Sequence, residues 1–248
     1  MIGKYKILLL CTIGLFAVRC STWTKDYSIL YTLPYINYGA NPTPELIDSP
    51  NNTVFLIGAH NILTKSDMDT SIGVFALNGS IRHQFSPFVE SGFVLNGAIK
   101  NKIFYYTVSD VKFQLLDEPI IICPDIGLGV GLAKVAWNLD FRVSAVLGYP
   151  VIEDCLYLHL MPKYVVLLYP WHVRGTDIGP IFHSYAFSSI YGFSAGLSFS
   201  QPLEPITHDT ALKLRIKPEL NYLVGSEPKL DQISFSIVQF GCQVGIAF

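Results

Sequence analysis

The stretch of sequence that decides the fold is QISFSIVQFGCQVGIAF, the last seventeen residues of the chain, Gln232 to Phe248. Every second position back from the C-terminus is apolar: Phe248, Ile246, Val244, Cys242, Phe240 and Val238. The intervening positions are small or polar: Ala247, Gly245, Gln243, Gly241 and Gln239. Because side chains alternate between the two faces of a β-strand, this period of two predicts a strand with two different environments.

The same alternation recurs along the chain from residue 52 onward. It is clear in residues 71–85, 89–100, 126–133, 137–149, 191–200 and 211–224. Asn78-Gly79 is nominally a hairpin signal. A turn there would place Phe75 opposite Arg82, with apolar facing polar at each step, so the register favours one continuous strand through the dipeptide. We expect longer polar connections near 62–69, 109–124, 150–154, 170–177, 201–210 and 225–231.

A strand that ends flush on a terminal aromatic residue resembles the last strand of bacterial outer-membrane β-barrels. In that class the terminal Phe is part of the signal read by the assembly machinery. The resemblance implies an all-β, antiparallel, up-and-down transmembrane barrel in the bacterial outer membrane. It also implies that Phe248 is an assembly signal, and that the partners of the chain are outer-membrane lipid and the barrel assembly machinery.

The composition agrees with such a barrel. Half of the 248 residues are hydrophobic and only 15% are charged, whereas about 25% charged is usual for a soluble domain. Beyond the N-terminus no run approaches the roughly 20 apolar residues of a spanning helix. We therefore expect residues 51–248 to form a barrel of about ten strands, with eight as the alternative. A net charge of −2 gives no argument for nucleic acid as a partner.

The N-terminus has the pattern of a secretory signal peptide over residues 1–20. Lys4 and Lys6 precede the apolar run Ile7 to Val18. Cys20 resembles the lipid-attachment Cys of bacterial lipoproteins, although Arg19 departs from the small residue expected before it. The alternative is ordinary cleavage near Cys20 without a lipid. Residues 21–50, which are rich in Pro, Asn and Ser, are expected to form a leader.

Charged residues at alternate strand positions are expected to face the lumen, because a Lys or Arg facing lipid at the midplane costs ~2–4 kcal/mol. By the same reasoning Leu197→Arg should abolish folding, while Ser198→Lys should be mild. The row Lys213, Arg215 and Lys217 is basic, so a small solute or extracellular ligand would more readily be anionic. Two interpretations stay open: a structural network of paired charges, and a ligand or ion path. The candidate lumen residues are Arg82, Glu90, Lys100, Asp140, Arg142, Lys213, Arg215, Lys217 and Glu219.

Signals of catalysis, metal binding and cofactor binding are weak. There is no G-x-S-x-G elbow, and His183 and Ser184 are adjacent, so on a strand they point to opposite faces. The run Ile126 to Ala133 has Leu132 where a dinucleotide motif needs Gly, so its glycines more simply mark close packing or a bend. No Cys/His cluster predicts a metal site. Cys123 and Cys155 are open to pairing or to remaining separate thiols.

These observations predict a small outer-membrane barrel, without a cofactor and not an enzyme, in a structural, adhesive or narrow-pore role. One alternative is a secreted soluble barrel that binds a hydrophobic ligand; its apolar faces would line the interior and its basic row would meet water. A second alternative is a lipid-modifying barrel enzyme such as an outer-membrane lipid hydrolase.

Overall fold

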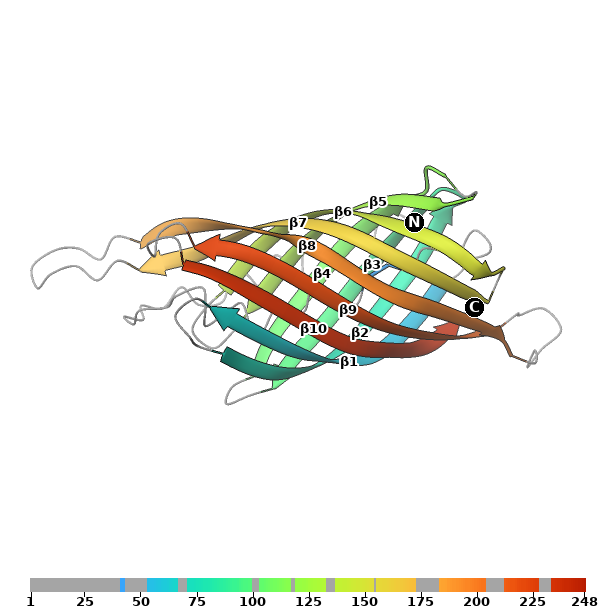
Figure 1. Ribbon diagram of the computed structural model, residues 1–248, viewed down its shortest axis with the longest axis horizontal. Coiled ribbons are helices and arrows are strands. Elements are labelled where there is room, and N and C mark those ends of the chain that lie inside the picture. The colour runs from blue at the N-terminus through green and yellow to red at the C-terminus, as the bar shows by residue number, and fades with distance from the viewer. Residues whose placement is uncertain are drawn as a thin grey trace, which may run out of the picture.

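Ten antiparallel strands close into one barrel (Figure 1). The structure is a computed structural model that describes residues 41–42, 53–66, 71–99, 103–116, 119–132, 137–153, 155–172, 183–203, 212–227 and 233–248. Each strand pairs with its neighbours in sequence, and the first pairs with the last. The strands are β1 (Thr53–Ser66), β2 (Ser71–Ser86), β3 (Val89–Ile99), β4 (Ile103–Phe113), β5 (Ile121–Leu132), β6 (Trp137–Ile152), β7 (Leu156–His172), β8 (His183–Pro202), β9 (Lys213–Glu227) and β10 (Ile233–Ala247).

The predicted ten-strand barrel is confirmed, and the eight-strand alternative is wrong. The continuous strand through Asn78-Gly79 is also confirmed, since β2 runs unbroken across it. Among the described residues, no helix has the length and apolar character needed to cross a membrane.

The seam of the barrel lies between β1 and β10. Their register runs from Val54 opposite Ala247 to Ser66 opposite Phe235. Thr53 and Phe248 extend it by two backbone hydrogen bonds, from Thr53 N to Phe248 O at 2.8 Å and from Phe248 N to Thr53 O at 3.0 Å. Both chain ends of the sheet therefore lie at one end of the barrel, which we call the terminal end; the opposite end is the distal end.

The outer surface is apolar on every strand with a clear alternation. Large hydrophobic side chains that point outward include Ile57, Leu77, Leu95, Leu128, Phe141, Leu160, Phe193, Leu220 and Val244. Trp137 and Tyr149 bracket this face on β6. At about 3.4 Å per residue and a tilt near 45°, their separation corresponds to roughly 28 Å along the membrane normal, close to the apolar band of about 25 Å in such barrels.

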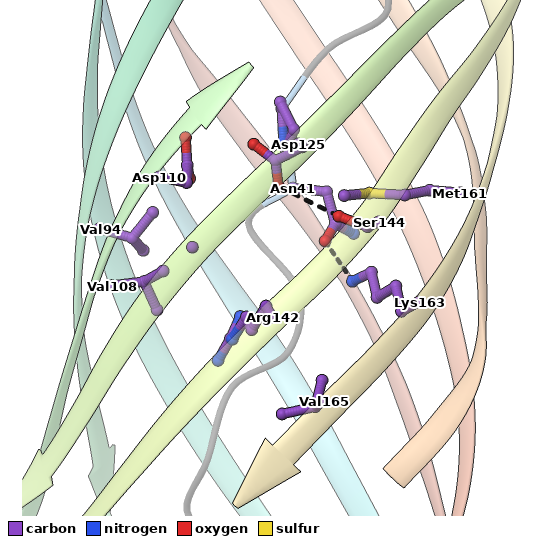
Figure 2. A pocket seen from close by; sticks show the side chains of 12 residues that line it. Asn41, Val94, Val108, Asp110, Asp125, Arg142, Ser144, Met161, Lys163 and Val165 are labelled. Carbon is purple, nitrogen blue, oxygen red and sulfur yellow. Dashed lines mark hydrogen bonds between the residues drawn. The ribbon is translucent and has the colours of Figure 1, made fainter. Parts of the chain in front are cut away.

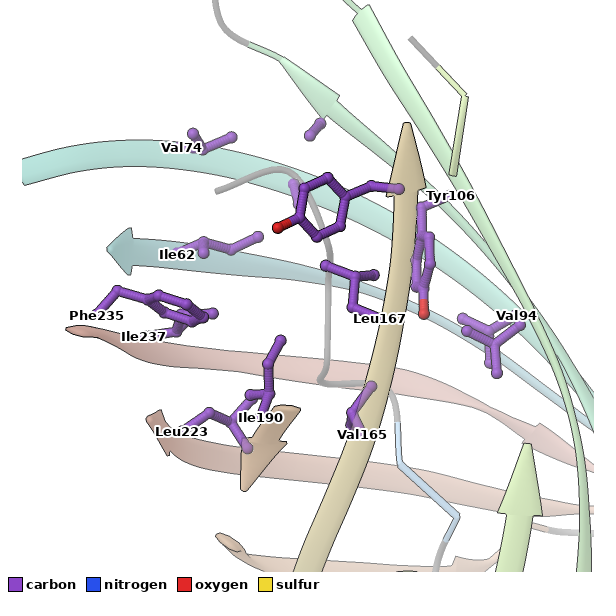
Figure 3. Close-up of a cluster of buried hydrophobic side chains, with 14 residues drawn as sticks. Ile62, Val74, Val94, Tyr106, Val165, Leu167, Ile190, Leu223, Phe235 and Ile237 are labelled. Carbon is purple, nitrogen blue, oxygen red and sulfur yellow. The ribbon is translucent and has the colours of Figure 1, made fainter. Parts of the chain in front are cut away.

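The interior is polar near the middle and apolar toward the distal end. Fourteen buried side chains form the distal apolar cluster, with members from every strand except β5 and β6. Figure 3 shows Ile62 and Phe235, on the adjacent strands β1 and β10, and Leu167, on β7, among them. Because barrels of about eight strands are narrow enough for side chains to fill, this cluster occupies the lumen at its level. The soluble alternative, with the apolar strand faces inside, is wrong.

Two prolines lie where a ladder is already interrupted. Pro218 pairs with Cys242 on β10, but the β8–β9 register passes from Gly196–Glu219 to Phe199–Ile216 without pairs between. Pro162 likewise faces an interruption of the β6–β7 register. Proline lacks the N–H that a ladder bond needs, so both prolines occupy positions where no such bond is lost.

The predicted polar connection at 109–124 is wrong. β4 continues to Phe113 and β5 begins at Ile121, so most of this stretch is strand. The physical reason is that charged side chains at alternate positions here face the lumen, which made a strand look like a loop. The strands around the other predicted connections also run further than expected, with β7 reaching His172 and β9 reaching Glu227.

Candidate functional site in the lumen

Most of the predicted lumen residues are buried inside the barrel. Arg82, Glu90, Asp140, Arg215, Lys217 and Glu219 are each at most 4% exposed. The Arg142 side chain is 12% exposed, and Lys213 near the terminal rim is half-buried. Lys100 and the lipidation candidate Cys20 lie outside the described residues.

Arg82 is the centre of the first group of charges. Its guanidinium donates a bidentate pair of hydrogen bonds to Asp110, with Nη2 to Oδ1 at 2.6 Å and Nη1 to Oδ2 at 3.1 Å. Its Nε donates to Glu90, and Lys112 Nζ lies 3.1 Å from the second Glu90 oxygen. Two cations and two carboxylates thus satisfy one another in a buried position, which is the condition under which buried charge is tolerated. We call these four residues the Arg82 cluster.

The strand register explains how further charges join this cluster. Glu90, Lys112, Asp125, Ser144 and Lys163 are successive cross-strand partners on β3 to β7. All five are buried and face the lumen, and the signs alternate along the row except at Ser144. Ser144 Oγ donates to Asp125 Oδ2 at 3.1 Å. Cross-strand neighbours of opposite charge are favourable pairs, so the register itself builds the network.

A closed ring of five side chains forms the second group. Lys217 Nζ donates to Gln243 Oε1 at 3.4 Å, and Gln243 Nε2 donates to Asn78 Oδ1 at 2.9 Å. Asn78 Nδ2 lies 2.7 Å from His60 Nδ1, and His60 Nε2 lies 2.8 Å from Glu219 Oε1. Lys217 Nζ closes the ring at 3.1 Å from Glu219 Oε2. The amide of Asn78 can only donate at Nδ2, so His60 carries its proton on Nε2 and donates it to Glu219.

Asn41, which precedes β1 in the sequence, lies inside the lumen against this ring. Its Nδ2 donates to Glu219 Oε2 at 3.1 Å and to Asn221 Oδ1 at 3.2 Å. Its Oδ1 accepts from Lys163 Nζ, and its backbone carbonyl accepts from Lys217 Nζ. Asn41 is only 5% exposed. A single residue from outside the sheet therefore supplies an oxygen to each of two buried lysines.

A third group lies on β4 and β6. Tyr106 Oη donates to Asp140 Oδ2, and Arg142 Nε donates to Asp140 Oδ1 at 2.8 Å. The Arg142 guanidinium carbon also lies 5.0 Å from the centre of the Tyr106 ring, in cation–π range. The Tyr106 hydroxyl and the Asp140 carboxylate fill the space in front of Gly129, where a Cβ would collide with both. The close-packing interpretation of this glycine run therefore agrees with its lumen face.

One device recurs in these groups: a glycine on the middle of three strands lets side chains on the outer two meet across it. Arg82 and Asp110 are both partners of Gly92. Gln243 and Asn78 are both partners of Gly58. His60 and Glu219 are both partners of Gly241. In each case a Cβ on the glycine would stand within 3 Å of one of the bonded side chains. Glycine here is required for close approach.

A fourth glycine, Gly196, also lies between two polar side chains, but these two side chains do not bond to each other. His159 and Glu219 are both partners of Gly196, and the His159 ring lies over that glycine. His159 is 1% exposed, yet neither ring nitrogen has a hydrogen-bond partner among the described residues. Both Glu219 oxygens are already engaged, with His60 on one and with Lys217 and Asn41 on the other. Buried polar atoms are nearly always bonded to protein or water, so an unpartnered one needs an explanation.

A small cavity lies beside Asn41 and Pro42 (Figure 2). Its lining is mixed: Asp110, Asp125, Arg142, Ser144 and Lys163 are polar or charged, and Val94, Val108, Met161 and Val165 are apolar. The space open to the centres of water molecules is about 20 Å³, enough for one or two waters. Asp125 Oδ1, which has no partner among the described residues, borders this space and would be satisfied by such a water.

Several residues of this site were missed from the sequence. Asp110 and Lys112 were assigned to a connection, Asp125 follows it, and Asn41 was assigned to the leader. His60, His159 and Lys163 lie on strands whose alternation is blurred, because the lumen there also carries apolar residues such as Met161 and Val165. The signal that could have found them is the combination of an interior charge with a glycine opposite it on the neighbouring strand, which requires the register.

The described cysteines, Cys123, Cys155 and Cys242, are free thiols. Cys123 and Cys155 therefore do not form a disulfide. Cys242 points outward on β10, as its position on the apolar face predicted. Among the described residues no group of His, Cys, Asp and Glu could hold a metal ion.

The apolar outer face, the polar lumen and the closed ladder fit a membrane-spanning sheet, because a closed barrel satisfies every strand's backbone without water. The protein is a closed, membrane-spanning β-barrel. No protein-family model matches the chain, and no curated protein matches it.

Three solved structures illustrate the barrels to which this one is similar. Ail from Yersinia pestis, in complex with the heparin analogue sucrose octasulfate, is 14% identical, with a TM-score of 0.31 over 81% of this chain and 100% of its own. Neisserial surface protein A is 12% identical, with a TM-score of 0.30 over 77% and 96%. The β-domain of the Bordetella autotransporter BrkA is 6% identical, with a TM-score of 0.40 over 77% and 98%. At these values the likeness does not extend to function.

Proposed function

We propose that this outer-membrane barrel is a sealed, membrane-embedded scaffold with a structural role, and that it is neither a pore nor an enzyme. The observation that carries the proposal is the filled lumen. The distal apolar cluster draws side chains from eight strands into the lumen, and a hydrophobic constriction excludes water and ions. The mid-lumen charges bind one another, as in the Arg82 cluster and the ring through His60.

Conductance of the purified full-length protein in planar lipid bilayers tests the proposal. The wild type is expected to give no stable conductance steps. A matched variant that removes bulk from the distal apolar cluster, Ile62→Gly with Leu167→Gly, is expected to conduct, which shows that the assay detects an opened barrel. Stable single-channel steps in the wild type would refute a sealed lumen and favour the narrow-pore role.

An adhesive role is the second candidate, and one observation favours it. β7 and β8 pair as far as His172 opposite His183, whereas β6 pairs with β7 only to Leu168 and β9 pairs with β8 only from Ser189. The β7–β8 hairpin thus projects beyond both neighbours at the distal end (Figure 1). Replacing residues 171–184 by an Asn-Gly turn should reduce the adhesion between cells that express the barrel. The measurement is the rate at which such cells clump and settle from suspension. Unchanged settling would remove this candidate.

The N-terminal features remain predictions. We propose that residues 1–20 are a signal peptide, that residues 21–50 are a leader, and that Cys20 carries a lipid. One acyl chain gives only marginal anchoring by itself, so the lipid would supplement the barrel. Mass spectrometry of the mature N-terminus decides this: an unmodified N-terminus would eliminate lipidation, and Cys20→Ser should remove the lipid while leaving the barrel inserted.

A further inference from the structure

We propose that Lys163, Lys217 and His159 form an oxyanion-binding site in the lumen, and that Asn41 of the same chain occupies it as an internal ligand. The inference goes beyond the sealed scaffold, because it concerns what the mid-lumen site binds and not whether the barrel conducts. The class of ligand is a small anion with at least two oxygens, such as phosphate or a carboxylate.

The way Asn41 is held is the first argument. Its side-chain oxygen accepts from Lys163, and its backbone oxygen accepts from Lys217. Both lysines are buried, with Lys163 at 8% and Lys217 at 0% exposure. A single residue with two oxygens directed at two ammonium groups occupies the position that two oxygens of phosphate or carboxylate would take. Hydrogen bonds from charged donors are stronger to a charged acceptor than to a neutral amide, which favours an anion at the two lysines. The anion would forgo the two bonds that Asn41 Nδ2 donates to Glu219 and Asn221.

His159 is the second and independent argument. Its ring is buried and has no partner on either nitrogen among the described residues. It is held over Gly196, with Lys163, Lys217 and Glu219 as the nearby charges. In the three other instances of the glycine device the side chain reaches a partner, and here the partner is missing. A ligand oxygen beside the two lysines would supply the acceptor that a ring N–H requires.

The origin of Asn41 is the third argument. The β-sheet supplies both lysines and the histidine, on β7 and β9, so the rigid part of the site persists when Asn41 is absent. Asn41 precedes β1 in the sequence and bonds to the sheet through these hydrogen bonds. The neighbouring cavity beside Asn41 and Pro42 is also lined by Lys163 (Figure 2). Removing the Asn41 side chain would therefore enlarge an existing cavity next to Lys163.

Thermal unfolding of the full-length barrel in detergent, in chloride and in inorganic phosphate at equal ionic strength, tests the inference. Asn41→Ala should melt lower than the wild type in chloride and should be restored by phosphate. At ten times the Kd, a bound ligand should raise Tm by roughly 3–6 °C. The wild type should respond much less, because Asn41 competes. In the Asn41→Ala background, Lys163→Gln should abolish the phosphate effect.

The control is Asn96→Ala, which removes another buried lumenal asparagine and should not respond to phosphate. If Asn41→Ala does not fold, Asn41→Ser provides the same comparison with a smaller loss of bonding. The inference is overturned if neither Asn41 variant shows a phosphate-specific rise in Tm, or if wild type, Asn41 variant and Asn96→Ala all rise equally. Conductance of the wild type would refute the sealed scaffold and leave this result unaffected.

Discussion

The imidazole of His159 lies directly over Gly196, its cross-strand neighbour on β8. A Cβ on Gly196 would stand 2.8 Å from Cε1 and 2.9 Å from Nε2 of the ring, and 2.5 Å from the backbone oxygen of Pro218. Real Cβ atoms do not approach other atoms so closely, and a backbone oxygen cannot move aside as a side chain can. The absence of a side chain at Gly196 therefore leaves the space that the His159 ring occupies.

Gly196→Ala is expected to destabilise the barrel by about 1–3 kcal/mol, the usual cost of inserting a methyl group into a packed interior. The measurement is urea unfolding in lipid vesicles, followed by tryptophan fluorescence. Gly97→Ala on β3 is the matched control, because a Cβ there meets nothing within 4 Å, and its effect should stay within about 0.5 kcal/mol. Equal effects of the two substitutions would contradict the close approach of His159.

Arg82→Met should destabilise the barrel by about 3–5 kcal/mol, because it leaves Glu90 and Asp110 without their shared cation in a buried position. Lys213→Gln should cost less than 1 kcal/mol, since Lys213 is only half-buried near the terminal rim and charges that water reaches contribute little. Both are measured by the same unfolding assay. A mild Arg82→Met would mean that water or another cation reaches the carboxylates.

Leu197→Arg should cost about 2–4 kcal/mol, because Leu197 points outward on β8 at 41% exposure and a cation there faces lipid. Leu197→Phe is the control for a change of size without charge and should be nearly neutral. The filled lumen also changes the expectation for Ser198→Lys: Ser198 is 0% exposed, so a lysine has no room and should be severe. A tolerated Ser198→Lys would show that the lumen beside Ser198 has room for a larger side chain.

Deleting Phe248 should lower the amount of folded barrel in the outer membrane several-fold. The residue closes the seam through two bonds with Thr53 and stacks on Phe55 at 5.7 Å. Heat-modifiability on denaturing gels measures the folded fraction. Phe240→Ala, at an outward aromatic position on the same strand, is the control and should assemble normally. Wild-type levels after the deletion would end the assembly-signal interpretation of Phe248.

Strand identity and facing were predictable from the sequence because a lipid-facing strand must be apolar at every second position. β6 satisfies this rule along its whole length, β2 satisfies it from Phe75 onward except at Gly79 and His83, and β10 satisfies it except at Ser234 and Ser236, so their faces follow from counting by twos. The connection assigned to 109–124 failed because Asp110, Lys112 and Asp125 look like loop residues when their partners are unknown. Their pairing depends on register between strands far apart in sequence, which no local pattern specifies.

The lumen site was predictable only as a set of charges. Counting by twos places Arg82, Lys217 and Glu219 inside, but it cannot say that Arg82 meets Asp110 or that Glu219 meets His60. Those contacts depend on Gly92 and Gly241, each on the strand between the partners. Asn41 was out of reach of any strand pattern, because it enters the lumen from outside the sheet.

The pairing of β1 with β10 also has a consequence for the order of folding. Contacts at the seam join residues from opposite ends of the barrel sequence, which is the highest contact order the sheet can have, and such contacts form slowly. Until β10 is in place, β1 has one unpaired edge, and open strand edges are where chains aggregate. The time during which the chain is prone to aggregate is therefore set by how long β10 takes to pair with β1, and not by the stability of any single hairpin. We expect an unfinished chain that lacks β10 to be held by chaperones or degraded, even though its first nine strands carry every charge of the Arg82 cluster.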